Sequence, residues 1–194
     1  MNVAFLGAEL PRWDQALRED GARAVALGLP FFEDERPLRG AAGLCDWRLG
    51  GRLSRLLGAT GATRLRGAFG EQLLMPSGRR LPWERLVLFG LGPAAGFDEA
   101  RARAAARELL RTLRALAPPA PKGASGAGRS EAEPPTLALV PPGRSTGALS
   151  ARQAVDLLLQ EATMVLVGAH PPQLVIVESA AGQKEAGELV RRLS

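Results

Sequence analysis

One stretch, residues 31–57, constrains the fold of this chain more than any other, and it reads FFEDERPLRGAAGLCDWRLGGRLSRLL. Its first ten residues predict a loop, because Pro37 prevents a helix from continuing through Arg36 and Gly40 supplies a flexible start to the next element. From about residue 41 to residue 57 the spacing predicts an amphipathic helix. Its apolar side carries Leu49, Leu53, Leu56 and Leu57, and another side carries Arg48, Arg52 and Arg55.

Two glycines, Gly50 and Gly51, lie inside this predicted helix. Each glycine destabilises a helix interior by about 1 kcal/mol relative to alanine. We therefore expect either close backbone packing or a break in the helix at this point.

A second ordered stretch lies further along the chain. The apolar residues 86–89 predict a buried strand, and Gly90, Leu91 and Gly92 follow it as a turn. Asp98, or a residue just before it, is the expected cap of a long helix that reaches Leu116. Strand, glycine turn and helix in this order form one half of a parallel β-α-β unit.

The remaining chain continues the alternation of strands and helices. We predict strands at 3–6, 22–29, 136–140 and 173–177, and one within 64–76 that ends in QLLMP; helices are predicted at 11–20, 150–165 and 180–193. The strand at 22–29 is apolar on both faces, which indicates a central strand, and Pro30 is expected to end it. Residues 117–135 are rich in proline, glycine and alanine, which predicts a surface linker. Because the alternation resumes after this linker, we predict one α/β domain with an insertion at 117–135.

Composition limits the compartment and the partners. The chain has 194 residues with no apolar run of transmembrane length, and its start lacks the pattern of a signal peptide, so we expect a cytoplasmic location. The formal net charge is +5, and all but two of the 25 basic residues are arginine, the exceptions being Lys122 and Lys184. Such a bias is as typical of a genome-wide coding preference as of a selected polyanion site.

The residue types needed for catalysis do not converge in this sequence. Two-metal hydrolases need several carboxylates with a lysine or histidine nearby, and no such partner stands near the acidic residues Glu33, Asp34, Glu35 and Asp46. We interpret these acids as a solvated loop and as a helix charge that pairs with Arg48 or Arg39. The single histidine, His170, precedes two prolines, and no serine stands in a G-x-S-x-G turn. The single cysteine, Cys45, is predicted to be a small buried residue, and we predict no catalytic or metal-ligating residue.

Two patterns are candidates for binding. The amides of the turn Gly90, Leu91 and Gly92 offer a cradle for a phosphate, although the glycine spacing misses the dinucleotide pattern and Pro93 lacks an amide donor. Basic stripes lie on the two predicted helices and suit either a protein partner or nonspecific contact with DNA. The first stripe comprises Arg48, Arg52 and Arg55, and the second comprises Arg103, Arg107, Arg111 and Arg114.

Residues 22–116 resemble the amino-terminal domain of the leucyl aminopeptidase family. The likeness rests on a loop of the form F-E-D-E-x-P-L-x-G, a helix of the form L-x-D-x-x-L-G-G-x-L-S-x-L-L, and a buried strand that ends in G-L-G. The matching residues are Phe32, Glu33, Asp34, Glu35, Pro37, Leu38, Gly40, Asp46, Leu49, Gly50, Gly51, Leu53, Leu56, Leu57, Gly90, Leu91 and Gly92. The resemblance implies a macro-domain-like three-layer sandwich, in which helices flank a mixed, mainly parallel sheet.

The same resemblance implies a function without catalysis. In the family, the metal ions and their ligands belong to a separate carboxy-terminal catalytic domain, and none of those residues is carried over to this chain. The amino-terminal domain helps to assemble the hexamer and contributes to DNA binding in some bacterial members. We therefore expect a noncatalytic module without a cofactor, which binds a protein partner or itself through the arginine-bearing helices or through Phe31 and Phe32. Nucleotide or ADP-ribose binding at the turn of residues 90–92 and nonspecific DNA binding through the arginine stripes remain as alternatives.

Overall fold

A computed structural model describes residues 2–18, 24–58, 65–78, 80–118, 134–168 and 171–192. Its centre is a six-stranded sheet with the order β1-β6-β5-β2-β4-β3. The strands are β1 (Val3–Gly7), β2 (Ala24–Phe31), β3 (Gln72–Pro76), β4 (Trp83–Gly90), β5 (Thr136–Leu139) and β6 (Gln173–Glu178). Neighbouring strands are parallel except for the edge pair β3 and β4, so the predicted mixed, mainly parallel sheet is confirmed.

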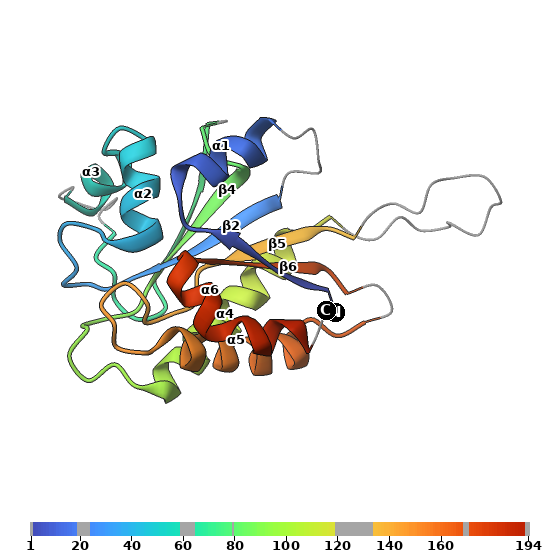
Figure 1. Ribbon diagram of the computed structural model, residues 1–194. Coiled ribbons are helices and arrows are strands. Elements are labelled where there is room, and N and C mark those ends of the chain that lie inside the picture. The colour runs from blue at the N-terminus through green and yellow to red at the C-terminus, as the bar shows by residue number, and fades with distance from the viewer. Residues whose placement is uncertain are drawn as a thin grey trace.

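Helices cover both faces of the sheet, which makes three layers (Figure 1). One face carries α1 (Leu10–Arg18), α2 (Gly40–Arg48) and α3 (Arg52–Gly58); the other carries α4 (Glu99–Leu116), α5 (Ala151–Val165) and α6 (Ala180–Arg191). Successive side chains of a strand point to opposite faces, so each central strand supplies both cores. In β4, for example, Leu86 and Leu88 pack under α2 and α3, whereas Val87 and Phe89 pack under α4.

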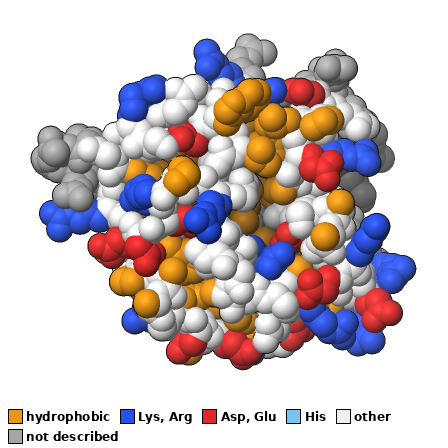
Figure 2. All heavy atoms as spheres, turned by 60° about the vertical axis from the view of Figure 1, so that its left-hand side comes forward, with side chains coloured by type: hydrophobic (Ala, Val, Ile, Leu, Met, Phe, Trp, Pro, Cys, Tyr) orange, Lys and Arg blue, Asp and Glu red, His pale blue; other side chains and the backbone are white. Residues whose placement is uncertain are grey.

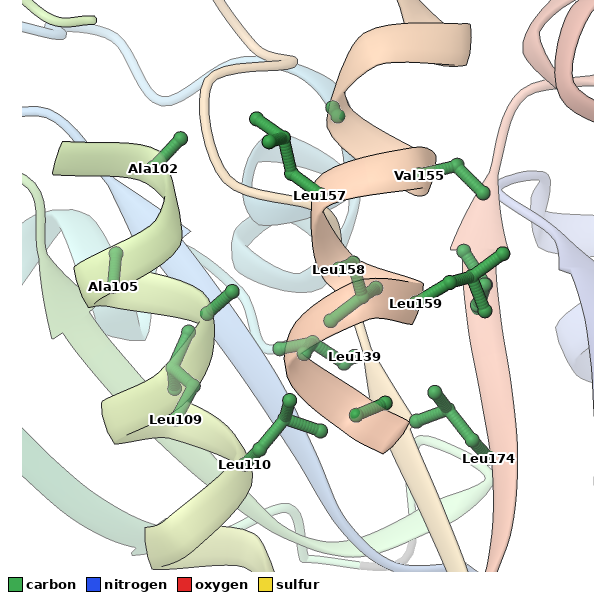
Figure 3. Close-up of a cluster of buried hydrophobic side chains, with 14 of the residues drawn as sticks. Ala102, Ala105, Leu109, Leu110, Leu139, Val155, Leu157, Leu158, Leu159 and Leu174 are labelled. Carbon is green, nitrogen blue, oxygen red and sulfur yellow. The ribbon is translucent and has the colours of Figure 1, made fainter. Parts of the chain in front are cut away.

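Buried side chains of α4, α5, β5 and β6 form one apolar cluster on this face of the sheet (Figure 3). The cluster is close-packed at Gly28 of the central strand β2. A Cβ atom added at Gly28 would lie 2.5 Å from Leu139 Cδ1, 3.2 Å from Leu113 Cδ1 and 3.3 Å from Leu109 Cδ2. Gly28 therefore lets α4 approach the sheet directly over β2. The prediction that this strand is central and buried on both faces is confirmed.

A buried carboxylate holds α4 against α5. Glu161 of α5 is 1% exposed, and its two oxygens accept hydrogen bonds from Arg107 Nε at 2.8 Å and from Arg107 Nη2 at 3.2 Å. Arg103 lies 3.7 Å from the same carboxylate and donates to Gln160 at 2.7 Å. At the other end of α4, Arg114 donates to the carbonyl oxygens of Val165 and Val167.

The predicted helix at 41–57 is wrong as a single helix, because it is broken at its glycine pair. Gly50 and Gly51 have φ values of 66° and 75°, in the left-handed region that favours glycine, and they separate α2 from α3. Asp46 was expected to pair with Arg48 or Arg39. Instead, Asp46 Oδ1 accepts hydrogen bonds from the backbone amides of Leu53 at 2.8 Å and Ser54 at 3.1 Å, so it caps the start of α3.

Pro30 does not end the central strand, which continues through Phe31. β2 pairs with β5 only as far as Gly28 and Leu139, so Pro30 stands where that ladder has finished and its missing amide interrupts no bond to β5. The other predicted elements are confirmed over the described residues, with small shifts at some ends, and the predicted ends at 19–20, 22–23 and 193 lie outside the described residues. The expected caps are also present: Asp98 accepts from Arg101 N, and Ser150 forms a capping box with Gln153.

The linker predicted at 117–135 lies largely outside the described residues, as do Lys122 and His170. The strands on its two sides belong to one sheet, because β5 pairs with β2 and with β6. Among the described residues, no helix is both long and apolar enough to cross a membrane.

We expect Glu161→Gln to lower the free energy of unfolding by about 1–2 kcal/mol, because a charged acceptor that two part-exposed arginines share is replaced by a neutral amide. Urea denaturation followed by circular dichroism measures this change. The matched control is Glu108→Gln, which removes the exposed pair of Glu108 and Arg111 on α4 and is expected to cost less than about 1 kcal/mol. Equal effects of the two substitutions would contradict the role given to Glu161.

Candidate functional site

The chain leaves two neighbouring parallel strands toward opposite faces of the sheet. β2 is followed by α2 on one face, and its neighbour β5 is followed by α5 on the other. The loops after these strands therefore diverge and leave a crevice outside the carboxyl ends of the strands, where open α/β sheets generally bind ligands.

A cleft of about 440 Å³ occupies this place, and we call it the central cleft. Figure 2 shows the molecule hollowed on the side where these loops lie. The cleft is lined by the start of α2, by the loops after β1 and β5, and by the end of β6. The lining residues are Ala8, Pro30, Arg39, Gly40, Ala41, Ala42, Leu44, Val140, Pro141, Gly143, Arg144, Ser145, Val177, Glu178 and Ser179.

A buried carboxylate ties the α2 side of the cleft to the β5 side. Glu35 is 5% exposed, and its Oε1 accepts a hydrogen bond from the backbone amide of Arg39 at 2.8 Å. Its Oε2 accepts from the Phe32 amide at 3.4 Å and from Ser145 Oγ at 2.7 Å. The expectation that Glu35 is solvated is therefore wrong. Glu35 holds the loop after β2 in shape and fastens it to the loop after β5.

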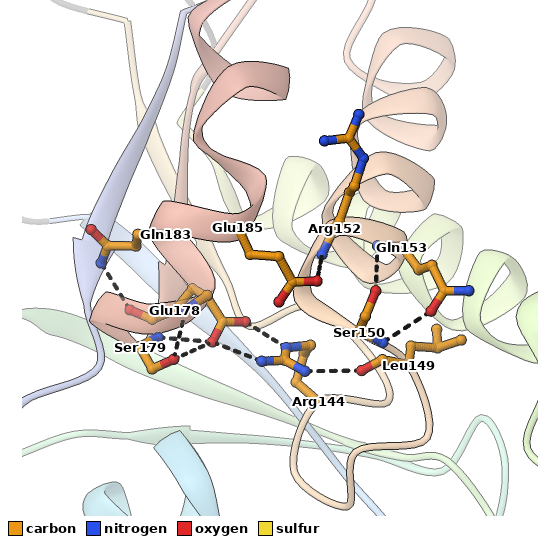
Figure 4. Close-up of polar contacts among 10 residues, drawn as sticks. Arg144, Leu149, Ser150, Arg152, Gln153, Glu178, Ser179, Gln183 and Glu185 are labelled. Atoms are coloured by element: carbon orange, nitrogen blue, oxygen red, sulfur yellow. Dashed lines mark hydrogen bonds and ion pairs between the residues drawn. The ribbon is translucent and has the colours of Figure 1, made fainter.

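A second carboxylate fastens the same loop to β6 (Figure 4). Arg144 Nε donates to Glu178 Oε2 at 2.7 Å, and Arg144 Nη1 donates to the carbonyl oxygen of Leu149 at 2.9 Å. Glu178 also accepts from the backbone amide and the hydroxyl of Ser179, at 2.8 and 3.0 Å. Adjacent residues of one loop, Arg144 and Ser145, therefore reach opposite walls of the central cleft, and this fixes its width.

The helices that begin near this end of the sheet differ at their amino ends. Side chains cap α4, α5 and α6, through Asp98, Ser150 and Ser179 respectively. The Glu185 carboxylate also accepts from the Arg152 amide at the start of α5, and this backbone hydrogen bond is the main cause that lowers the pKa of Glu185 (Figure 4). The first residue before α2, Arg39, forms no capping hydrogen bond with its side chain. Gly40, Ala41 and Ala42 at the start of α2 line the central cleft, and the Arg39 side chain does not cap their amides.

The turn of Gly90, Leu91 and Gly92 lies beyond the described lining of this cleft. Its amides donate within the protein: Gly90 N to Glu71 O at 2.9 Å, Leu91 N to Phe31 O at 2.9 Å and Gly92 N to Gly67 O at 2.8 Å. A Cβ atom at Gly90 would stand 2.2 Å from the carbonyl oxygen of Ala68. Ligand binding at this turn stays a prediction, and the contacts give the glycines a structural role.

The predicted contact residues Phe31 and Phe32 are in the core, which corrects the expectation that they lie on the surface. Their side chains are 1% and 0% exposed, and the Phe32 ring meets Phe97 edge to face with centroids 4.9 Å apart. Consecutive residues of an extended chain point to opposite faces, so each ring enters a different core.

The predicted arginine stripes are largely engaged by the protein itself. The stripe on α4 lies along the seam with α5, where Arg103, Arg107 and Arg114 bond to residues of α5 or of the segment just after it, and Arg111 pairs with Glu108. In the other stripe, Arg48 pairs with Asp14 of α1, and Arg55 donates to Gly50 O at 2.8 Å. Because the helix is broken after residue 48, Arg48 does not share one continuous helix with Arg52 and Arg55. Their contact with a partner stays a prediction.

The remaining residues that were considered for metal binding or catalysis are Glu33, Asp34 and Cys45. Asp34 Oδ1 accepts from the Ala94 amide at 3.0 Å, and Glu33 is exposed. No group of three histidine, cysteine, aspartate or glutamate residues suited to a metal ion occurs in the part of the chain that the structure describes. Cys45 is fully buried as predicted, and burial raises the pKa of its thiol, with the nearby charge of Asp46 adding to the shift.

Sequence reasoning missed the residues that line the central cleft, in particular Arg39, Arg144, Ser145, Glu178 and Ser179. One signal was available, because residues 140–145 directly follow β5, Glu178 ends β6 and Ser179 follows it, and both strands were predicted. The carboxyl ends of parallel strands meet at one edge of a sheet, so loops that follow them are the first place to look for a site.

Comparison with solved structures identifies the fold. A Trypanosoma brucei macrodomain in complex with ADP-ribose is 14% identical, with a TM-score of 0.60, over 99% of this chain and 68% of that chain. The macrodomain of Mycobacterium tuberculosis DarG is 14% identical, with a TM-score of 0.54, over 91% of this chain and 98% of that chain. A mutant of tomato leucine aminopeptidase is 12% identical, with a TM-score of 0.55, over 96% of this chain.

This chain spans 35% of the length of the tomato leucine aminopeptidase chain. No protein-family model matches the sequence, and no curated protein does so with significance. At these identities the likeness shows the fold alone. The expected macro-domain-like fold, common to the macrodomains and to part of the leucine aminopeptidase, is confirmed.

We expect Gly90→Ala to lower the free energy of unfolding by more than about 3 kcal/mol, because the new methyl group would overlap the backbone of residues 67 and 68. Urea denaturation measures the loss. Gly96→Ala is the control: Gly96 has a φ of 73° but no atom within 4 Å of an added Cβ, so only backbone strain of about 1–2 kcal/mol is expected. A Gly90→Ala protein of native stability would remove the structural reason for this glycine.

Proposed function

We propose that the chain is a binding module that holds an ADP-ribose-type nucleotide in the central cleft. The observation that carries this proposal is the position of the cleft, outside the carboxyl ends of β2, β5 and β6, at the point where the chain leaves the sheet toward opposite faces. A volume of about 440 Å³ lies within the range of small-molecule sites. A solved neighbour of the same fold, the Trypanosoma brucei macrodomain, is in complex with ADP-ribose, which supports this class of ligand.

The chemistry of the cleft suits a phosphate-bearing ligand of moderate charge. In the part of the chain that the structure describes, the Arg39 guanidinium has no protein partner, and it stands beside the uncapped start of α2. The hydroxyl groups of Ser145 and Ser179 also line the cleft, where they donate to Glu35 and Glu178 respectively. Arg144 is neutralised by Glu178, so the cleft does not have the dense positive charge that a long polyanion requires. This favours a nucleotide over DNA.

The proposed site replaces the turn of residues 90–92 as the location of the ligand. The turn has its three amides bonded to carbonyl oxygens of the protein, whereas the central cleft has an open volume with polar groups on two walls. We also propose that binding proceeds without catalysis. Glu35 and Glu178, the buried carboxylates nearest to the cleft, are already engaged by hydrogen bonds from the protein.

Self-association is the second candidate function, and the edge strand β3 is the observation that favours it. β3 pairs with β4 through Leu73 and Met75, so the peptide groups of Gln72 and Leu74 point away from the sheet. Leu74 is 48% exposed and nearby Phe69 is 44% exposed. Among the described residues no strand pairs with the outer side of β3, and an edge with exposed apolar side chains is suited to pairing with a second copy of the strand.

Titration calorimetry with ADP-ribose tests the first proposal. We expect saturable binding to the native chain, and we expect Arg39→Ala to weaken it by about tenfold through loss of a charge-assisted hydrogen bond. Arg85→Ala is the control, because Arg85 is an exposed arginine of β4 outside the cleft lining. Chromatography of the incubated ligand is expected to recover ADP-ribose unchanged. Absence of heat at millimolar ligand would end the proposal, and hydrolysis would end its noncatalytic part.

Light scattering measures the second candidate. We expect the native chain to have at least the mass of a dimer, and Leu74→Lys to shift it to the monomer, because a charge on the unpaired edge opposes strand pairing. Met164→Lys is the matched control on α5, where Met164 is 57% exposed away from the sheet edge. A native chain that is monomeric at all concentrations would contradict this candidate.

A further inference from the structure

Trp47 is the most exposed large apolar residue in the part of the chain that the structure describes, at 68%. The other two tryptophans, Trp13 and Trp83, are 0% and 1% exposed and meet edge to face with ring centroids 5.1 Å apart. Tryptophan is among the residues that carry most of the binding energy where proteins meet. Because one exposed indole is not a site by itself, its surroundings decide what it can bind.

Trp47 lies at the end of α2 that is away from the central cleft. The first residue of α2, Gly40, lines the cleft, whereas its last residue, Arg48, donates from Nε to the carbonyl oxygen of Arg80 at 3.3 Å. Arg80 precedes β4, so this end of α2 lies near the amino end of that strand, where α3 lies beside α2 (Figure 1). The surface around Trp47 is therefore separate from the central cleft.

Arginines stand close to this end of α2. Gly50 connects Trp47 to Arg55, because Gly50 N donates to the Trp47 carbonyl oxygen at 3.0 Å and Arg55 Nη1 donates to the Gly50 carbonyl oxygen at 2.8 Å. Arg52 begins α3 just after this turn, and Arg80 is held against the end of α2 by the hydrogen bond described above. We call Trp47, Arg52, Arg55 and Arg80 the tryptophan patch.

The positive charge of the tryptophan patch is not balanced within the described residues. Its arginines are exposed, and none of them forms an ion pair with a carboxylate in that part of the chain. Two neighbouring acids are already engaged, since Asp14 pairs with Arg48 and Asp46 caps the start of α3. The patch therefore presents an apolar ring together with uncompensated guanidinium groups.

We propose that the tryptophan patch binds an acidic segment of a partner protein, with an apolar side chain on the indole and carboxylates on the guanidinium groups. Guanidinium groups bind carboxylates through paired, charge-assisted hydrogen bonds. A second copy of this chain does not fit, because a symmetric contact about Trp47 would bring the same arginines together. DNA fits less well, because these few arginines make few phosphate contacts and a single ring is a small stacking platform. The proposed partner site is independent of nucleotide binding in the central cleft.

Selection from short random peptides displayed on phage, with the native chain as bait, tests this proposal. We expect the enriched peptides to carry net negative charge and an apolar side chain, and to bind less tightly as the salt concentration rises. A synthetic enriched peptide is expected to protect the exposed indole from acrylamide, a quencher that does not reach the two buried indoles. The same peptide with its acids replaced by amides is expected not to bind.

Substitutions locate the contact on the chain. Trp47→Ala and Arg52→Glu are each expected to weaken binding of the enriched peptides about tenfold or more, by removing the ring and by reversing a charge. The matched controls are Met164→Ala on α5 and Arg101→Glu on α4, at exposed positions on the other face of the sheet, and they are expected to leave the affinity unchanged. Circular dichroism confirms that the variants remain folded.

Three results would overturn the proposal. Enriched peptides that keep their affinity for Trp47→Ala would show that they bind elsewhere, and a selection that enriches nothing would remove the peptide partner. A dimer of the native chain that dissociates in Trp47→Ala would identify a second copy as the occupant. Binding of a short DNA duplex that is lost in Arg52→Glu, with no peptide enriched, would identify nucleic acid instead.

Discussion

The burial of β2 on both of its faces is the constraint on which the rest of the structure depends. A parallel strand at the centre of a sheet must be covered above and below, so one chain has to send helices to both sides of it. Here α2 leaves β2 toward one face, and α4 closes the other face over Gly28. The divergence of the loops after β2 and β5 follows from this requirement. The central cleft is therefore a geometric consequence of covering the sheet.

Carboxylates then fix the loops that this arrangement leaves at the edge of the sheet. Glu35 and Glu178 bind the loop after β5 from opposite walls of the central cleft. Asp46 caps the start of α3, and Glu161 joins α4 to α5. Glu71 accepts three successive amides, those of Arg66, Gly67 and Ala68, at 2.9, 2.7 and 3.2 Å. In a chain of net charge +5, these acidic residues act as internal anchors. Several arginines that suggest an open basic surface in the sequence are consequently partners of such anchors or of backbone carbonyls.

The sequence predicted the elements of the fold well and the candidate site poorly, for one physical reason. Strands and helices follow from local periodicity, and caps such as Asp98 and Ser150 act within a few residues. The contact of Glu35 with Ser145 joins residues 110 positions apart, and Arg144 meets Glu178 across 34 positions. Nothing in the local pattern around Glu35 distinguishes a solvated loop acid from a buried anchor. The break at Gly50 and Gly51 was one of two expectations that local propensity left open.

By itself, the sequence determined the order and type of most elements and the central position of β2, since these depend on local chemistry and on apolar spacing. It also carried the motifs at 31–57 that resemble the leucyl aminopeptidase family. The tertiary structure decided which charges are paired, that Phe31 and Phe32 enter the two cores, and where the cleft lies. It also decided that the amides of residues 90–92 are used by the fold while the start of α2 faces the cleft. The physical reason is that a binding surface is made by loops which only the completed sheet brings together.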